Sequence, residues 1–281
     1  MNGRLAYHVV VNAMEARAGW TDQSRFASAV ASVICGHHPH RRYREAGAAR
    51  KREGAGEGVV EKLVGHWMPI DLNPAVQIVS NLRSEAAVIA AYNAYNAAVD
   101  LGVRTSIARP DGQGGLVVRR DSFVDEPDPE TCRLGSVMVV EAVMARVRRA
   151  RESEAPPKRQ SLSGVAEMLG LGSTAAGEAC AAIESLGHVP VAELARALGC
   201  GQRTLERRLR EQGVTADALR QAARLVAATG RLAEGVSLTE IAVDEGFCDL
   251  PHMAKAFRIS CGMAPSLCRR MVVGEVCAAS A

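Results

Sequence analysis

The chain has 281 residues, of which 48% are hydrophobic and only 4% aromatic. This length is enough for two domains of ordinary size, and an Ala-rich composition favours helices around an aliphatic core. No apolar run approaches the roughly 20 residues that a membrane-spanning helix needs, and the first residues lack the pattern of a secretion signal. We therefore expect a cytoplasmic protein with no membrane partner.

The charge is unevenly distributed. A formal net charge of +3 is too small to indicate a nucleic-acid partner by itself. Residues 187–271 hold 12 Lys and Arg against 9 Asp and Glu, whereas residues 1–186 hold 22 against 21. The positive surplus therefore lies in the C-terminal third.

Cysteine and histidine usage does not indicate a metal site. None of the eight cysteines forms a CxxC pair, so we expect reduced thiols packed as small apolar residues. The stretch "CGHHPH" brings together Cys35, His37, His38 and His40. A structural metal needs four converging ligands, and no second cluster completes this one. We expect neither a metal nor another cofactor.

The first 58 residues contain one ordered and one irregular part. "AYHVVV" predicts a strand, and "TDQSRFASAVASVI" predicts a helix that Thr21 or Asp22 caps. Residues 37–58 contain no Val, Ile or Leu, so they are expected to form a flexible, solvated segment. Their basic runs "RRYR" and "RKR" are expected to face solvent, with contact to DNA or RNA as the alternative.

The next part of the chain mixes helices with a hairpin. "SEAAVIAAYNAYNAAVDLG" predicts a helix capped by Ser84 and ended by Gly102. Two short strands follow around "GQGG", which lacks the Lys-Ser/Thr of a phosphate-binding loop. "SVMVVEAVMARVRRARE" predicts a further helix, and "SEAPPKRQS" a linker. Tyr92 and Tyr95 are expected to pack in the core, with a small-molecule pocket as the alternative.

From residue 174 the pattern is almost wholly helical, and its first part has the form of a helix-turn-helix. "VAELARALG" predicts a short helix ending at Gly199, and "QRTLERRLREQ" a second helix. On this second helix Leu205 and Leu209 share one face. Glu206 has the spacing to pair with Arg210. The outward arginines indicate either a solvated helix face or a surface that meets a negatively charged partner; they are Arg203, Arg207 and Arg210, with Arg208 at the edge of the apolar stripe.

A second helix-turn-helix follows a long helix. Residues 215–235 predict a helix of about 30 Å with Thr215 as its cap. Ser237 and Glu240 have capping-box spacing, and another helix begins after Asp249. Adjacent major-groove segments on one side of duplex DNA are about 34 Å apart. One chain with this duplication is therefore long enough to place its two second helices in successive groove segments.

These stretches resemble the DNA-binding domain of AraC/XylS-type bacterial transcription regulators. The resemblance rests on "RTLERRLREQG", "IA…GF", "AFR", "G…AP" and the terminal "CRR", and it covers roughly residues 174–271. The form "RRLREQG" is most similar to a subgroup whose N-terminal domain is a helical ligand-sensing module. Residues 66–150 are weakly similar to that module.

The resemblance implies two recognition helices, at residues 202–212 and 250–261. It places Arg203, Glu206 and Arg207 toward bases. Leu250 and Pro251 occupy the start of the second helix, where members of the family often have polar residues. Met253 follows His252, at a position where the family often has an aromatic residue. We therefore expect the first unit to read sequence and the second to anchor. The implied DNA-contacting residues are Arg203, Thr204, Glu206, Arg207, Arg208, Arg210, Leu250, Pro251, His252, Lys255 and Arg258.

Together these observations predict a mainly α protein in which an α+β or mostly helical N-terminal domain precedes an all-α DNA-binding domain. The expected boundaries are a sensing or dimerisation domain at 1–150, a linker at 151–173, the DNA-binding domain at 174–271 and a tail at 272–281. No nucleophile constellation indicates an enzyme. Double-stranded DNA is the expected partner; RNA polymerase, a small-molecule effector and a second copy of the chain are further candidates. Two alternatives stay open: a non-sensing N-terminal region, and a fused enzyme or metal-binding domain.

Overall fold

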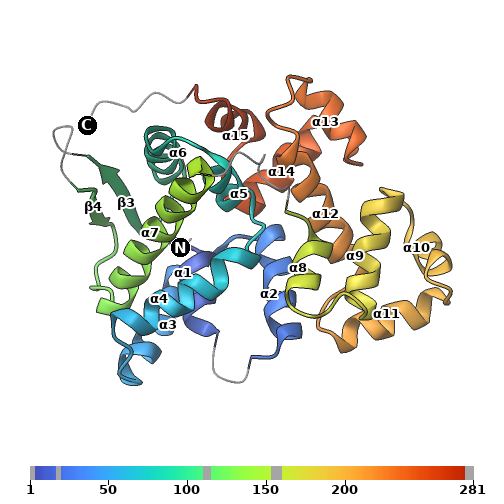
Figure 1. Ribbon diagram of the computed structural model, residues 1–281, viewed down its shortest axis with the longest axis horizontal. Coiled ribbons are helices and arrows are strands. Elements are labelled where there is room, and N and C mark those ends of the chain that lie inside the picture. The colour runs from blue at the N-terminus through green and yellow to red at the C-terminus, as the bar shows by residue number, and fades with distance from the viewer. Residues whose placement is uncertain (1–3, 17–19, 110–114, 153–159, 276–281) are drawn as a thin grey trace.

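The computed structural model describes residues 4–16, 20–109, 115–152 and 160–275. Within these ranges the protein is mainly helical, with two small antiparallel sheets of two strands each. The N-terminal elements occupy one side of the molecule and the yellow-to-red C-terminal helices the other (Figure 1). The predicted fold class is confirmed.

The N-terminal strand is shorter than the sequence suggested. β1 spans Leu5–Tyr7, and the chain turns at once into α1, His8–Glu15. Nearly every side chain of α1 is buried, and a segment buried on all sides shows no periodicity that separates strand from helix. α2 spans Asp22–Ile34, and the Thr21 hydroxyl accepts the Ser24 N–H at 3.2 Å, as the capping pattern predicted.

The expectation that residues 37–58 are flexible is wrong. β2, His37–Pro39, pairs with β1, and α3, His40–Arg52, packs against α1 and α7. The buried face of α3 uses Tyr43 and Ala46, and a Cβ on Gly47 would lie 2.2 Å from the Cys132 sulfur. A helix without Val, Ile or Leu is therefore held by aromatic packing and close backbone approach.

The central elements follow the sequence pattern more closely. α4 is Glu57–Trp67, η1 is Met68–Ile70, α5 is Pro74–Asn81 and α6 is Glu85–Ala98. Ser84 caps α6 as predicted, but the helix ends before Gly102. β3, Val103–Ala108, pairs with β4, Val117–Ser122, in the predicted hairpin. Most of its "GQGG" turn lies outside the described residues. α7 is the long helix Glu130–Glu152.

The predicted linker at 151–173 contains a helix of the fold. α8 spans Leu162–Met168 and packs against α9, with Leu162, Val165 and Ala166 buried. Ser161 caps it by accepting the Gly164 N–H at 3.1 Å. The apolar spacing in "SGVAEMLG" is the sequence signal for this helix, and the proline-containing part of the linker lies outside the described residues.

The C-terminal helices are α9 (Ala175–Leu186), α10 (Val191–Ala197), α11 (Gln202–Glu211), α12 (Ala216–Gly230), α13 (Leu238–Asp244), α14 (Leu250–Cys261) and α15 (Pro265–Val272). α12 has 15 residues, so it spans about 22 Å rather than the expected 30 Å. Thr215 caps it as predicted. Of the cysteines in the described residues, all are free thiols and four are buried.

The two halves of the chain share one hydrophobic core. α12 packs on α2 and α5, α14 packs on α2, α5 and β2, and α15 packs on α5 and α6. Figure 1 shows α14 and α15 next to the N-terminal helices α5 and α6. The N-terminal region therefore contacts the second helix-turn-helix unit directly.

Candidate nucleic-acid interface

The first helix-turn-helix unit consists of α10, a tight turn and α11. Leu205 and Leu209 are 1% and 0% exposed, so they fix the inner face of α11 as the helical wheel predicted. Gly199 in the turn has a φ of +66°, a conformation that favours glycine. These contacts orient the opposite face of α11 toward solvent.

The outer face of α11 is basic, and its ion pairs lie at the surface. Arg207 donates to Glu211 at 2.7 Å, and Arg210 pairs with Glu206 at 3.5 Å, as its spacing predicted. Surface pairs of this kind contribute only about 0.2–1 kcal/mol. Both guanidinium groups can therefore exchange their carboxylate partners for a phosphate or a base at small cost.

Arg203 and Arg208 are exposed and form no hydrogen bond or ion pair with any residue that the structure describes. Glu206 is half-buried and accepts a hydrogen bond from the Gln202 amide at 2.8 Å, in addition to its pairing with Arg210. Thr204 is also half-buried. In the unbound protein Glu206 is thus already engaged by its own helix.

The second unit consists of α13 and α14, and both helices begin with side-chain caps. Ser237 and Glu240 form the predicted capping box of α13. The Asp249 carboxylate accepts the His252 backbone N–H at 2.7 Å, and Pro251 occupies the first turn of α14. The start of α14 is therefore fixed by a cap that α11, which begins after Gly201, does not have.

The outward residues of α14 differ from those of α11. Pro251, Lys255 and Arg258 are exposed, and Leu250 is half-buried. The exposed His252 has a structural role as well, because its Nδ1 accepts the Cys248 N–H at 3.1 Å and its ring stands edge-on to Phe247 at 5.5 Å. Nε2 is left as the nitrogen available to an external partner. The surface is less basic than that of α11.

Comparison with known proteins supports this view of the C-terminal part. A family model described as a helix-turn-helix domain matches residues 194–271. Residues 194–271 are an AraC-type helix-turn-helix domain. This part of the chain accordingly carries a DNA-binding helix-turn-helix domain.

No curated protein matches the chain. Among solved structures, the crystal structure of transcriptional regulator CdpR from Pseudomonas aeruginosa is similar at 16% identity and a TM-score of 0.29, covering 90% of this chain and 99% of that one. A TM-score at that level does not establish a common fold. Among the described residues, no helix has the length and apolarity to cross a membrane.

The inner side of α14 carries contacts that the sequence did not reveal. The Ser260 carbonyl accepts the Gly36 N–H at 2.7 Å and the Asn73 side-chain amide at 2.9 Å. The Ser260 hydroxyl donates to the Val33 carbonyl. Asn73 and Ser260 are each 0% exposed. We refer to the contact of Asn73 with Ser260 as the joint between the two regions. Its only signal in the sequence is Asn73-Pro74, which marks a helix start and does not indicate a contact with a residue 187 positions away.

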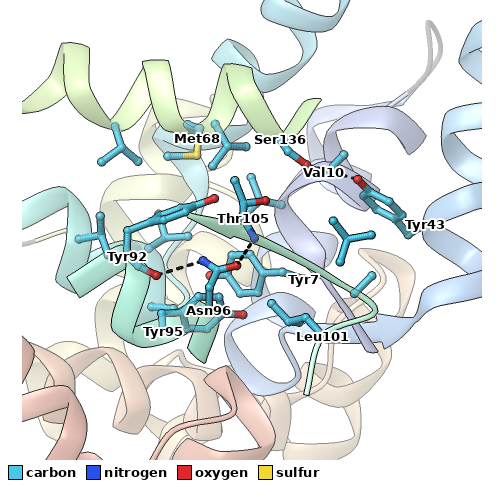
Figure 2. A pocket seen from close by; sticks show the side chains of 18 of the residues that line it. Tyr7, Val10, Tyr43, Met68, Tyr92, Tyr95, Asn96, Leu101, Thr105 and Ser136 are labelled. Carbon is cyan, nitrogen blue, oxygen red and sulfur yellow. Dashed lines mark hydrogen bonds between the residues drawn. The ribbon is translucent and has the colours of Figure 1, made fainter. Parts of the chain in front are cut away.

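A cavity of about 90 Å³ lies within the N-terminal region (Figure 2). Its wall is formed mainly by side chains from β1, α1, α3, η1, α5, α6, β3 and α7. Tyr95 is buried in this wall and Tyr92 is half-buried. The alternative interpretation of these two tyrosines, that they line a pocket, therefore describes their position, while Tyr95 is also part of the core.

The histidine cluster "CGHHPH" does not converge on one point. His37 lies 3.3 Å from the Tyr95 hydroxyl, His38 contacts Asn12, and His40 pairs with Asp128 at 2.9 Å. Cys35 is exposed. No group of three or more potential metal ligands is found in the described part of the chain.

Proposed function

We propose that this protein is a transcription regulator that binds specific DNA sequences by placing α11 and α14 in adjacent major-groove segments, and that its N-terminal region senses a small molecule. The observation that carries the proposal is the pair of helix-turn-helix units on either side of α12, each with an exposed polar or basic face on its second helix. We further propose residues 174–271 as the DNA-binding domain.

The chemistry of α11 suits base reading. Arg203 and Arg207 can each donate two hydrogen bonds to O6 and N7 of guanine, a contact that contributes about 1–3 kcal/mol of discrimination. Arg208 and Arg210 are proposed phosphate contacts, which position the protein without reading sequence. Thr204 and Glu206 lie between these arginines, and the bonds that Glu206 forms within α11 suit it to orient them.

The chemistry of α14 suits anchoring. Lys255 and Arg258 are exposed cations without a partner among the described residues, and they are proposed to contact phosphates. His252 offers one N–H from Nε2, because its Nδ1 is already an acceptor. Leu250 and Pro251 provide apolar contact and no hydrogen-bond donor. This composition supports a smaller contribution of α14 to sequence discrimination.

The cavity in the N-terminal region supports the sensing role over the alternative of a non-sensing N-terminal region. Mostly apolar pockets with a few convergent polar groups are typical of small-molecule sites. For the alternative of a fused metal-binding domain, the described residues offer no group of three or more potential ligands.

Selection of bound duplexes from a random pool, with the full chain, tests this function. We expect enrichment of one motif that spans two groove segments. The double variant R203A/R207A should lose the enrichment and keep only weak, salt-sensitive binding. Arg41 supplies a matched control, because it is an exposed arginine in an i,i+4 pair with Glu45, far from the interface in sequence. R41A should select the wild-type motif, and enrichment by R203A/R207A equal to wild type contradicts the proposal.

A further inference from the structure

The size of the N-terminal cavity limits what it can hold. Its volume is about 90 Å³, and one water-sized group needs roughly 10–15 Å³ by the same measure. There is room for roughly six to nine such groups. Most of the aliphatic wall comes from α1, α5 and α7, with Val10, Val76 and Val139 among its members. A single six-membered ring with one substituent matches this space.

The wall also determines the charge of the ligand. It contains no Asp, Glu, Lys or Arg, and burial of an ion without a counter-charge is strongly unfavourable. His40, the one basic side chain in the wall, is already paired with Asp128. The phenols stay protonated, since burial raises the pKa of Tyr92 to about 12 and that of Tyr7 and Tyr95 well above its usual range. A neutral ligand is therefore favoured over an anion or a cation.

A few polar groups interrupt the apolar wall. Figure 2 shows Asn96, Thr105 and Ser136 among the tyrosines around the cavity. His40 also lines the cavity, and its Nδ1 is buried without a hydrogen-bond partner among the described residues. Because the His40 Nε2 bonds Asp128, Nδ1 is left as an acceptor in the neutral ring. One hydrogen-bonding substituent on the ligand is thus accommodated.

Tyr7 connects the cavity to α14 through one intermediate residue. Its hydroxyl donates to the Asn73 side-chain oxygen at 3.2 Å. The Asn73 amide donates in turn to the Ser260 carbonyl, in the last turn of α14. A Cβ on Gly36 would lie 2.3 Å from the Asn73 amide nitrogen and 2.4 Å from the Ser260 carbonyl. We refer to Tyr7, Asn73 and Ser260 as the Tyr7 path, and Gly36 packs closely against its last two members.

Tyr95 makes a second connection of the same length. Its hydroxyl lies 3.3 Å from Nε2 of His37, and the backbone of Ile259 in α14 lies next to the His37 ring. A neutral imidazole has one donor and one acceptor, so this ring is suited to bridge the phenol and the Ile259 carbonyl. We refer to Tyr95, His37 and Ile259 as the Tyr95 path. It reaches α14 one residue before the Tyr7 path does.

Tyr92 provides the internal contrast. Its hydroxyl lies next to the side chains of Thr105 and Asn96, and its backbone carbonyl accepts the Asn96 amide at 3.0 Å. Both residues belong to the N-terminal region. Tyr92 therefore lines the same cavity, but among the described residues it has no hydrogen-bonded connection to α14. If the two paths carry the effect of the ligand to α14, loss of the Tyr92 hydroxyl should leave that effect intact, whereas loss of the Tyr7 and Tyr95 hydroxyls should reduce it.

We propose that the cavity binds a small neutral molecule, a single ring with one hydrogen-bonding substituent, and that its occupancy changes DNA binding by moving the last turn of α14 through the Tyr7 and Tyr95 paths. This rests on the proposed sensing function and identifies its ligand class and its route. A ligand changes the balance between two states only if it binds them with different affinity. Contact with the Tyr7 and Tyr95 rings supplies that difference.

Benzyl alcohol and benzoate test the ligand class, because they share a ring and differ in charge. Calorimetric titration into the full chain should show saturable binding of benzyl alcohol at least tenfold tighter than that of benzoate. Y92F, Y7F and Y95F should bind benzyl alcohol within about fivefold of wild type. Absence of saturable benzyl alcohol binding, or equal binding of benzoate, overturns the proposed ligand class.

Hydrogen exchange of the amides at 259–263, with no DNA present, tests the route. Benzyl alcohol should change their exchange rates at least about fivefold in wild type and in Y92F, the low end of typical allosteric couplings. In Y7F and in Y95F the change should shrink, and in the double variant Y7F/Y95F it should fall toward none. A double variant Y7F/Y95F that responds like wild type overturns the two paths.

Operator binding separates this inference from the proposed function. A wild-type chain that selects no DNA contradicts the proposed function, and the exchange result still decides the two paths. A chain that selects an operator should show a benzyl alcohol-dependent shift in Kd that Y92F keeps and Y7F/Y95F loses. A shift that Y7F/Y95F keeps in full overturns the route through α14.

Discussion

The two recognition helices of this protein are built on the same plan and supported in different ways. α11 is held by two buried leucines within its own unit, and its arginines are exposed. α14 has a side-chain cap at its start and is bonded at its end to Gly36 and Asn73 of the N-terminal region. One helix is thus supported by the DNA-binding part alone, and the other is shared with the region that contains the cavity.

This difference suggests that the two helices have different functions. A helix that reads bases benefits from a fixed face of exposed guanidinium groups, which α11 has. A helix whose last turn is bonded to another region can transmit a change in that region, which α14 is placed to do. Discrimination between DNA sequences is then expected to depend on α11, and the regulation of DNA binding on α14.

The largest expected effect comes from breaking the attachment of α14. In Gly36→Ala the new Cβ would lie within 2.4 Å of the Asn73 amide and the Ser260 carbonyl. Overpacking and the loss of buried hydrogen bonds should together destabilise the protein by about 2–4 kcal/mol. Urea denaturation measures the change. Gly65→Ala is the matched control, because a Cβ at Gly65 meets nothing within 4 Å and removal of a helical glycine should be neutral or stabilising.

Next come the arginines of α11. On a selected operator, R203A and R207A should each weaken specific binding by about 1–3 kcal/mol and relax the preference at one base position. K255A on α14 should cost less and affect all sequences alike. Fluorescence anisotropy on the operator and its single-base variants measures both quantities. Equal losses of specific binding in the three variants would remove the distinction between a reading and an anchoring helix.

A pH effect is expected at the joint between the two regions. Burial, with the nearby His8 and His38, lowers the pKa of His37 to about 4, so the folded state favours the neutral ring. Stability from His37 is present above the unfolded pKa of about 6.5 and is lost as the pH falls toward 4, by up to about 2 kcal/mol between pH 7 and 5. His37→Gln should flatten this part of the urea-stability profile. His66→Gln, at an exposed histidine of α4, should keep the wild-type slope.

The smallest effect is expected at the start of α14. Asp249→Ala removes the carboxylate that accepts the His252 N–H, and loss of an N-cap costs about 1 kcal/mol. The change should appear as a lower urea midpoint with an unchanged denaturant slope. Asp249→Asn should recover most of the loss, because an Asn side chain caps helices as well as Asp does. A midpoint unaffected by Asp249→Ala would show that the joint at Ser260 alone fixes α14.

Local signals in the sequence predicted much of the C-terminal part. Leu205 and Leu209, the capping box of Ser237 and Glu240, and the cap at Thr215 act within a few residues, so their spacing is visible in the chain. The structure confirms each of them. The roles of Arg203, Arg207 and the other implied DNA contacts stay predictions, since they depend on a partner.

What the sequence could not predict depends on distant contacts. α3 was missed because Tyr43, Ala46 and Gly47 bury a face without any Val, Ile or Leu, and Gly47 packs on Cys132, which is 85 residues later. The joint of Asn73 with Ser260 joins residues 187 apart and has no pattern along the chain. The cavity likewise collects side chains from eight elements, so only the folded chain brings Tyr92 and Tyr95 beside Thr105 and Ser136.

Guanine methylation interference on the selected operator, with the full chain, tests most directly whether both helices enter the major groove. N7 methylation blocks only major-groove contacts. We expect two interfering patches about one helical turn apart, with R203A/R207A removing interference in one patch and leaving the other. A single patch in wild type, or interference that R203A/R207A leaves unchanged in both patches, would contradict groove entry by both helices.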